Sequence, residues 1–315
     1  MKAILIEEFG GPEVMNLVEM PDPVPGAGET LVEISRTGVN FSDTHITNDH
    51  YVARQQLPLV PGIEFVGVTD DGRRVAAVVP NGAYAERIAV PESSLVAIPD
   101  EIDDEQAAGI MIQGVTADGV LTLTGSLKPG ETVVVGAAAG GTGSLAVQLA
   151  RSMGAGRVIG LASGEEKQQL VLDLGADAVV DSRSENLGDE VVAAAGGGVD
   201  LVLEMAGGSS FDQLLGTLRP FGRMIVVGIA TREQNEVRTG KLLKNSISVS
   251  GFWLMHLLAR PDLARDSIDR VFGATARGEL KAVVGGTFGL SEARQVHRDI
   301  AGRKTVGKLL LDPKR

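Results

Sequence analysis

The chain has 315 residues, a formal net charge of −12 at pH 7 and no cysteine. At about 150 residues per domain, its length predicts two domains. The 43 % of apolar residues exclude disorder for most of the chain. The acidic charge and the 3 % of aromatic residues argue against a nucleic-acid surface and against binding to an anionic membrane. The lack of cysteine excludes disulfides, thiolate metal ligands and a cysteine nucleophile.

Residues 1–115 carry short β-like runs separated by turn dipeptides rich in proline, glycine and asparagine. This pattern predicts a compact, mainly β domain. The opening apolar run, Met1–Ile6, is too short for a secretory signal, so we expect a cytoplasmic protein. A helix is expected over residues 107–124, with Asp103 or Asp104 as its cap.

The second half of the chain has a regular alternation of strand-like and helix-like segments. Apolar, strand-like runs begin near Thr132, Arg157, Ala178, Val199, Arg223 and Ser246. They recur every 21 to 25 residues, and helix-compatible stretches fill the intervals. Such alternation with continuous apolar strands predicts a doubly wound parallel sheet, covered by helices on both faces. A further helix is expected over residues 262–277, followed by short strand-like runs at 286–288 and 308–311 with another helix between them.

The strongest motif lies in residues 132–150, where an apolar strand runs into glycines and then into a helix. Aligned on its last glycine, the loop follows the dinucleotide-binding pattern, with alanine at the first position. Glycines there let the backbone approach a pyrophosphate, and the helix N-terminus offers N–H donors. No Lys-Ser/Thr pair follows, which excludes a Walker loop; a glycine-rich turn that binds nothing is the alternative. The candidate cofactor-binding residues are Ala138, Gly140, Gly141, Thr142 and Gly143.

The end of the second strand-like run bears on the choice between NADH and NADPH. An NAD-binding chain usually has an acidic residue there, which holds the ribose hydroxyls. This chain has Ser163 instead, and Lys167 lies one helical turn further on. A hydroxyl and an ammonium favour the 2′-phosphate of NADPH. Alternatively, Ser163 caps a helix and Lys167 is a solvated surface charge.

Four motifs follow one another along the chain. They are Gly38-Val-Asn-Phe-Ser-Asp43, Leu57-Pro-Leu-Val-Pro-Gly-Ile-Glu64, Gly82-Ala-Tyr-Ala-Glu86 and Ala137-Ala-Ala-Gly-Gly-Thr-Gly143. Together they resemble the zinc-independent quinone oxidoreductase (zeta-crystallin-like) branch of the medium-chain dehydrogenase/reductase superfamily. The resemblance implies an α/β protein with a GroES-like, mainly β domain over residues 1–115 and 261–315. It also implies a Rossmann-type NADPH-binding domain over residues 116–260.

The departures from the zinc-dependent branch predict that no metal is bound. That branch needs a cysteine where Val39 or Asn40 stands, and Ile63 replaces the histidine that precedes Glu64. The four histidines lack a metal-ligand spacing. We therefore interpret Glu64 as a structural or polar-network residue.

The resemblance also implies roles for particular residues. It assigns Asn40 and Tyr51 as catalytic candidates that assist the acceptor. It assigns Asp43, His45 and Trp253 as candidates for substrate binding, and Thr116, Gly228 and Lys308 as further cofactor-binding candidates. Purely structural alternatives stay open: a turn cap for Asp43, a half-exposed loop position for His45, a packing role for Tyr51 and an interface strand for Trp253.

The expected activity is hydride transfer from NADPH to a quinone or a similar conjugated carbonyl compound. A 2-enoyl-thioester or enone reductase uses the same hydride chemistry and is the first alternative; Gly251-Phe-Trp-Leu254 resembles a motif of such reductases. A non-catalytic, NADPH-binding regulatory protein is the alternative of another class. The sequence does not distinguish the natural acceptor.

The last Rossmann strand predicts how two chains associate. Residues 246–254 would lie at the edge of the sheet and carry little charge to prevent pairing with another strand. Two-fold pairing of this strand would satisfy its edge and bury Phe252 and Trp253. We therefore expect a homodimer with a small-molecule substrate and neither a nucleic-acid nor a membrane partner.

Overall fold

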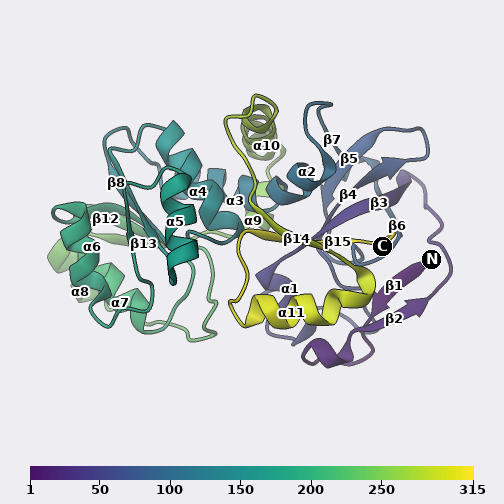
Figure 1. The fold of residues 1–315 in the computed structure, drawn as a ribbon, viewed down its shortest axis with the longest axis horizontal. Coiled ribbons are helices and arrows are strands. Elements are labelled where there is room, and N and C mark those ends of the chain that lie inside the picture. Colours follow the sequence, from purple (N-terminus) through teal and green to yellow (C-terminus); the bar gives the residue numbers. More distant parts are fainter. The chain divides into compact units, whose positions relative to one another are not determined.

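The computed structural model describes all of residues 1–315, which divide into two compact domains. The first domain comprises Met1–Ile112 and Phe272–Arg315, and the second comprises Gln113–Val271. The boundaries therefore lie after residues 112 and 271, whereas the sequence placed them after residues 115 and 260. Figure 1 follows the chain from the purple N-terminal strands through the teal and green second domain to the yellow C-terminal segment.

The first domain is built on a seven-stranded sheet with the order β14-β15-β3-β4-β5-β7, and β6 pairs with β3. Its strands are β3 (Glu29–Val39), β4 (Glu64–Thr69), β5 (Arg74–Val78), β6 (Arg87–Pro91), β7 (Val96–Ala97), β14 (Val284–Gly289) and β15 (Lys308–Asp312). A separate hairpin joins β1 (Lys2–Leu5) to β2 (Asn16–Glu19). Buried side chains such as Val32, Ile34 and Phe65 form the core inside the curved sheet. The mainly β domain expected from the sequence is therefore present.

The helices of the first domain are short and begin at recognisable caps. They are α1 (Phe41–Thr47), α2 (Asp104–Ile110) and α11 (Ala293–Ala301), with 3₁₀ turns η1 (Pro12–Val14), η2 (Glu92–Ser94) and η4 (Leu290–Glu292). Asp103, one of the two caps expected from the sequence, caps α2 by accepting the Gln106 N–H at 2.7 Å. The helix α1 was not anticipated, because its seven residues show too little periodicity.

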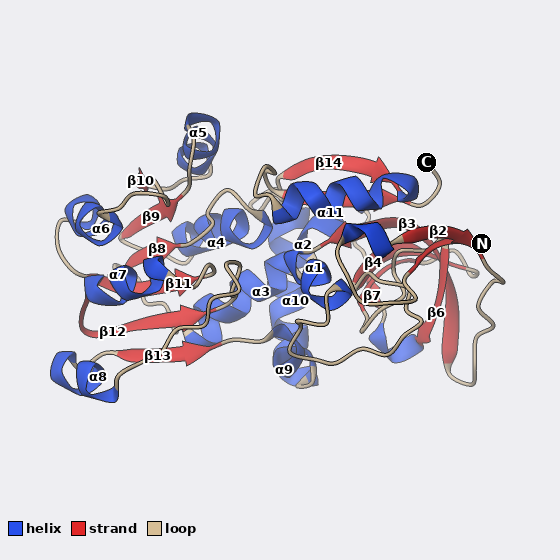
Figure 2. Ribbon diagram, turned by 90° about the horizontal axis from the view of Figure 1, so that it is seen from below, coloured by secondary structure: helices blue, strands red, loops and turns tan.

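The second domain is a six-stranded, wholly parallel sheet. Its strands are β8 (Thr132–Val135), β9 (Arg157–Leu161), β10 (Ala178–Val180), β11 (Val199–Glu204), β12 (Leu218–Val226) and β13 (Ser248–Gly251). The strand order is β10-β9-β8-β11-β12-β13, and Figure 2 shows the strands stacked in that order. The alternation read from the sequence is thus confirmed, and β13 lies at an edge as expected.

Helices lie before, between and after the strands of this sheet along the chain. They are α3 (Gln113–Gly119), the π-helix η3 (Val120–Thr124), α4 (Gly141–Ser152), α5 (Glu165–Asp173), α6 (Leu187–Ala195), α7 (Ser209–Thr217), α8 (Thr239–Asn245), α9 (Leu254–Leu258) and α10 (Pro261–Ala276). The run Asp104–Thr124 is long and apolar enough to cross a membrane by composition, but 78 % of its apolar window is buried in the fold, as in the core helix of a soluble protein.

Two details of the second domain differ from expectation. The last strand is shorter than residues 246–254, because β13 ends at Gly251 and Trp253 becomes the N-cap of α9. Phe221, near the start of β12, adopts a left-handed backbone with φ of 68° although its side chain is 85 % exposed. An L-residue other than glycine is strained there because its Cβ crowds the following carbonyl.

Candidate active site

The buried polar centre of the first domain lies where β3 ends and α1 begins. Asn40 is the N-cap of α1, and its backbone N–H donates to Asp43 Oδ2 at 2.8 Å. Its side-chain Nδ2 donates to Glu64 Oε1 at 3.0 Å and to Gly38 O at 3.3 Å. Lys308 Nζ donates to Asn40 Oδ1 at 2.8 Å and forms an ion pair with Glu64. The chain thus fixes the orientation of the Asn40 carboxamide at both of its polar atoms.

The Glu64–Lys308 pair is almost completely removed from water. Burial lowers the pKa of Lys308, and the neighbouring Glu64 carboxylate acts in the opposite direction. Glu64 Oε2 also accepts the backbone N–H of Ile112 at 3.0 Å. A buried carboxylate needs such partners, because an unpaired charge in the interior is very costly. The prediction that Glu64 belongs to a polar network is consistent with these contacts.

A second set of hydrogen bonds runs from Asp43 to the C-terminal helix α11. The Tyr84 hydroxyl donates to Asp43 Oδ2 at 3.0 Å and lies 2.9 Å from His297 Nε2. Since the tyrosine proton points to Asp43, His297 Nε2 must carry the proton that it donates to Tyr84 Oη. Asp43 Oδ1 and His297 Nδ1 are buried and have no hydrogen-bond partner.

Burial strongly perturbs the protonation of this second set. It raises the pKa of Asp43 to about 7, although the Asn40 N–H, Lys308 and Tyr84 all favour the carboxylate. It lowers the pKa of His297 to about 4, so the imidazole is neutral. Burial also raises the pKa of Tyr84, helped by the charge of Asp43. Perturbed groups of this kind gather at functional sites, and structural networks can perturb them equally.

The other first-domain candidates lie on α1 and in the loop after it. His45 is half-buried on α1, with its ring 5.4 Å from that of Phe41. Tyr51 packs against the hydrophobic cluster that contains Ile46 and Tyr84. The structure brings Asn40, Asp43 and Lys308 into one network. Sequence reasoning missed Tyr84 and His297 in it, because they are 213 residues apart and only the fold joins them.

The glycine loop of the second domain has the geometry of a phosphate cradle. Gly140 is the N-cap of α4, and a Cβ built on Gly143 would lie 2.2 Å from Ala137 O. A Cβ on Gly141 would meet Gln113 Cγ at 2.9 Å. No larger residue fits at Gly143, so the loop can only pack on the strand as it does here. This close approach, together with the free N–H groups in the first turn of a helix, suits a pyrophosphate.

The end of β9 gathers two cations. Burial lowers the pKa of Lys167, and the positive charge of Arg183 lowers it further while Glu166 opposes this. Arg183 follows β10, the strand beside β9, and its guanidinium also lies 3.6 Å from Asp181. Ser163 precedes α5 but does not cap it, because Gly164 is the N-cap. Arg183 was missed by sequence reasoning, although its place just after the neighbouring strand could have indicated it.

The remaining candidates also lie in the second domain. Thr116 is buried on α3. Gly228 follows β12, and a Cβ there would lie 3.1 Å from Met205 O. Trp253 forms an edge-to-face contact with His256, at a ring separation of 4.9 Å. The cofactor-binding roles expected for Thr116 and Gly228 and the substrate-binding role expected for Trp253 stay predictions.

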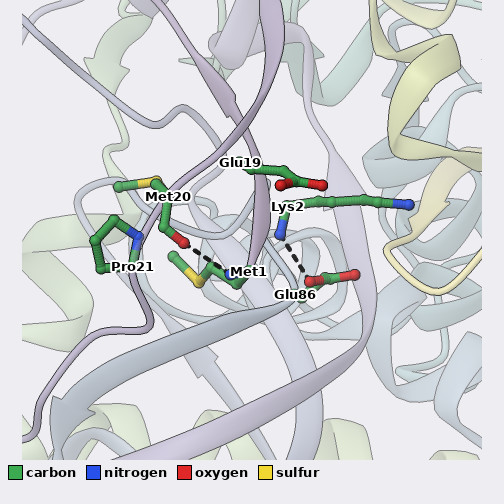
Figure 3. Close-up of a pocket in the computed structure, with 6 residues that line it drawn as sticks. All are labelled: Met1, Lys2, Glu19, Met20, Pro21 and Glu86. Atoms are coloured by element: carbon green, nitrogen blue, oxygen red, sulfur yellow. Dashed lines mark hydrogen bonds between the residues drawn. The ribbon is translucent and has the colours of Figure 1, made fainter.

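A surface hollow in the first domain includes none of these candidates (Figure 3). It is lined by Met1, Lys2, Glu19, Met20, Pro21 and Glu86. The N-terminal ammonium donates to Met20 O at 2.7 Å, and the Lys2 N–H donates to Glu86 Oε2 at 2.7 Å. These bonds hold the start of β1 in place, so the polar groups that line the hollow serve the fold. Nowhere in residues 1–315 do three His, Asp or Glu side chains converge to hold a metal ion.

Comparisons with known proteins agree with this arrangement over almost the entire chain. Residues 26–100 match the alcohol dehydrogenase GroES-like domain, and residues 141–272 match the family described as zinc-binding dehydrogenase. The chain is 33 % identical to a quinone oxidoreductase of Pseudomonas aeruginosa, with 99 % of each sequence covered. It is 31 % identical to a 2-haloacrylate reductase of a Burkholderia species, with coverage of 99 % of this chain and 98 % of that one.

Solved structures show the same relationship. The quinone oxidoreductase of Thermus thermophilus, studied also in complex with NADPH, is 37 % identical, with a TM-score of 0.90 and coverage of 99 % of this chain and 100 % of that one. The Escherichia coli quinone oxidoreductase, complexed with NADPH, is 29 % identical, with a TM-score of 0.94 and the same coverage. With its GroES-like first domain and its Rossmann-type second domain, this chain belongs to the quinone oxidoreductase branch of the medium-chain dehydrogenase/reductase superfamily.

Proposed function

We propose that the protein is an NADPH-dependent oxidoreductase that reduces a quinone or a similar conjugated carbonyl compound. The observation that carries the proposal is the second-domain cofactor site. It combines a glycine loop that tolerates no side chain at Gly143 with two cations, Lys167 and Arg183, and no acid at the end of β9. Relatives with NADPH bound support the choice of cofactor.

The chain's own residues divide the binding of this cofactor between them. The N–H groups in the first turn of α4, those of Gly141, Thr142 and Gly143, would receive the pyrophosphate. Ser163, Lys167 and Arg183 hold the 2′-phosphate by charge-assisted hydrogen bonds. Thr116 and Gly228 border the nicotinamide half. When bound, NADPH supplies a hydride, and the protein supplies orientation and stabilisation of the charge that forms on the acceptor.

The acceptor is served by residues of the first domain. Tyr51 contributes an apolar ring and a hydroxyl that donates to the acceptor oxygen. Asn40 contributes an amide N–H, for which it gives up its bond to Gly38 O at 3.3 Å. Lys308 and Glu64 keep the carboxamide oriented during this exchange. Overall, acceptor, NADPH and one proton give the reduced acceptor and NADP⁺.

The proposal is tested by following NADPH oxidation with a naphthoquinone, phenanthrenequinone, a simple enone and a crotonyl thioester. Turnover of the quinones supports the proposal. Turnover of only the enone or the thioester favours the alternative of an enone or enoyl-thioester reductase, for which the similarity to 2-haloacrylate reductase is the supporting observation. Tight NADPH binding without turnover of any acceptor would indicate a non-catalytic regulatory protein.

The variant Tyr51→Phe distinguishes the acceptors further. A quinone yields a stabilised hydroquinone anion that water can protonate, so losing the hydroxyl should change quinone turnover little. An enoyl thioester yields a more basic enolate, and losing a positioned donor there should slow turnover by roughly 10²–10³-fold. Unchanged turnover of every acceptor, with weakened NADPH binding, would place Tyr51 in the cofactor site instead.

A further inference from the structure

Glu204 is a buried acid that the proposed function does not use. It is the last residue of β11, and its side chain is almost completely buried. Its Oε1 accepts the backbone N–H groups of Ala206 and Gly207, both at 2.8 Å. Its Oε2 is buried and has no hydrogen-bond partner. A buried polar atom left in this state is costly, so it calls for an explanation.

The position of Glu204 in the sheet offers an explanation for its unpartnered Oε2. Ligands of doubly wound sheets bind outside the carboxyl ends of the strands, where the strand order changes direction. Here that point lies between β8 and β11, since β9 and β10 extend the sheet on one side and β12 and β13 on the other. Glu204 stands at this point. The first residue of the glycine loop, Gly136, donates its N–H to Leu203 O at 2.9 Å, and a Cβ on it would lie 3.9 Å from Glu204 Cα.

The surroundings of Glu204 favour the uncharged acid. Burial raises its pKa, while the two N–H groups oppose this and no cation takes part. At the same level of the sheet, β8 is followed by Gly136 and β12 by Val227, neither of which carries a charge. Glu233, on the loop after β12, borders Gly208 and is exposed. Because Oε1 accepts both N–H groups, the proton of the acid resides on Oε2.

Glu204 also holds the loop that follows β11, residues 205–208. The Ala206 and Gly207 N–H groups fix residues 205–208 beneath the carboxyl group. From this loop, Met205 O accepts the Ala230 N–H at 3.2 Å and Ala206 O accepts the Thr231 N–H at 2.8 Å. The loop after β11 is therefore tied to the loop after β12, which contains Gly228.

We propose that Glu204 is a positioning residue for the pyrophosphate–nicotinamide half of the dinucleotide and that it must be uncharged for tight binding. The inference rests on the proposed binding of NADPH. In its protonated form Glu204 supports the loop without opposing the cofactor's phosphates. Once ionised, it places a negative charge at the strand end that receives them, in an interior where charges are weakly screened. Cofactor affinity is therefore complete at low pH and is lost as Glu204 ionises.

The test measures the dissociation constants of NADH and NADPH by cofactor fluorescence from mildly acidic to mildly alkaline pH at constant ionic strength. NADH is the main probe, because the 2′-phosphate of NADPH itself titrates in this range. Wild-type affinity for NADH should fall roughly tenfold across the range. Glu204→Gln, which keeps the shape of the neutral acid, should bind NADH at every pH as tightly as the wild-type protein does at low pH. Glu233→Gln removes an exposed acid from the adjoining loop and should keep the wild-type profile.

The outcomes separate this inference from the proposed function. A Glu204→Gln profile parallel to wild type, or a uniform loss of affinity at every pH, overturns the inference while leaving NADPH binding intact. Binding of neither nucleotide at any pH contradicts the proposed function and this inference with it. If Glu204→Gln does not fold, proton uptake on NADH binding to the wild-type protein is measured in weak buffer over the same pH range. Uptake that grows as the pH is raised supports the inference, and no uptake at any pH refutes it.

Discussion

Replacing Asp43 with asparagine should make the stability of the first domain depend on pH in a way that the wild-type protein conceals. The pKa of Asp43 is raised from 3.8 to about 7 in the folded chain, so the fold favours the protonated acid. Its contribution to stability is present below pH 3.8 and is lost as pH rises towards 7. The pKa of His297 is lowered from 6.5 to about 4, so its contribution is present above pH 6.5 and is lost as pH falls towards 4.

The two effects oppose each other over the same range. At about 1.4 kcal/mol per pH unit, Asp43 alone makes the free energy of unfolding fall by roughly 4 kcal/mol as pH rises, and His297 alone makes it rise by roughly 3 kcal/mol. Between pH 4 and pH 6.5 they nearly cancel. Asp43→Asn keeps an oxygen for the Asn40 N–H and the Tyr84 hydroxyl and removes the first effect. The variant should therefore gain roughly 3 kcal/mol of stability from pH 4 to pH 6.5, relative to wild type.

The assay is urea unfolding at several pH values, read by hydrogen exchange of peptides from α1 and α11. Trp253 is the only tryptophan and lies in the second domain, so its fluorescence gives an internal control in the same samples. His297→Gln is the reciprocal variant and should lose stability as pH rises. If Asp43→Asn and wild type have parallel pH profiles, the proton is not held by Asp43 and the coupling between the two residues is refuted.

Four further predictions concern the cofactor, the backbone, the assembly and metals. Lys167→Ala and Arg183→Ala should each weaken the binding of NADPH by roughly ten- to a hundredfold in a fluorescence titration, because a charge-assisted phosphate contact is worth roughly 1.5–3 kcal/mol. The affinity for NADH should barely change. Equal losses of affinity for both nucleotides would contradict a 2′-phosphate role. Phe221→Gly should stabilise the second domain by roughly 1 kcal/mol, because it relieves a left-handed backbone at a side chain that is 85 % exposed; a lower urea midpoint would show that the ring makes contacts that matter. We propose a homodimer through residues 246–254, so light scattering should give about twice 32.8 kDa, and Val249→Pro should shift this towards the monomer; a dimer that survives the substitution has its interface elsewhere. Metal analysis should find no stoichiometric zinc, and chelators should leave activity intact; one zinc per chain would overturn this expectation.

The second domain could be predicted from the sequence because the patterns that specify it, apolar strands and a glycine loop, are contiguous in the chain. The inner strands β8 and β11 are largely apolar and buried on both faces, and the glycine loop follows directly from β8. The last strand was predicted too long, since the apolar residues after Gly251 pack as the start of α9 and not as an edge strand. An apolar run by itself does not distinguish those two structures.

The polar centre of the first domain could be predicted only in part. Asn40 and Asp43 are neighbours in a motif, whereas Tyr84, His297 and Lys308 reach them from distant parts of the chain. Nothing in the local sequence marks a histidine as buried and neutral, because burial is set by the packing of α11. Long-range contacts of this kind become visible only in the fold.

The position of β15 has a consequence for the synthesis of the protein. This strand lies between β14 and β3, pairing Leu309, Leu310 and Leu311 with residues of β3. The sheet of the first domain therefore cannot close until β15 has left the ribosome, whereas the second domain is continuous and can fold earlier. Loss of β15 would also remove Lys308 and leave Glu64 buried without its counter-charge. A product that lacks β15 should consequently be recognised as unfolded and degraded, so that the folding of the polar centre depends on the synthesis of this strand.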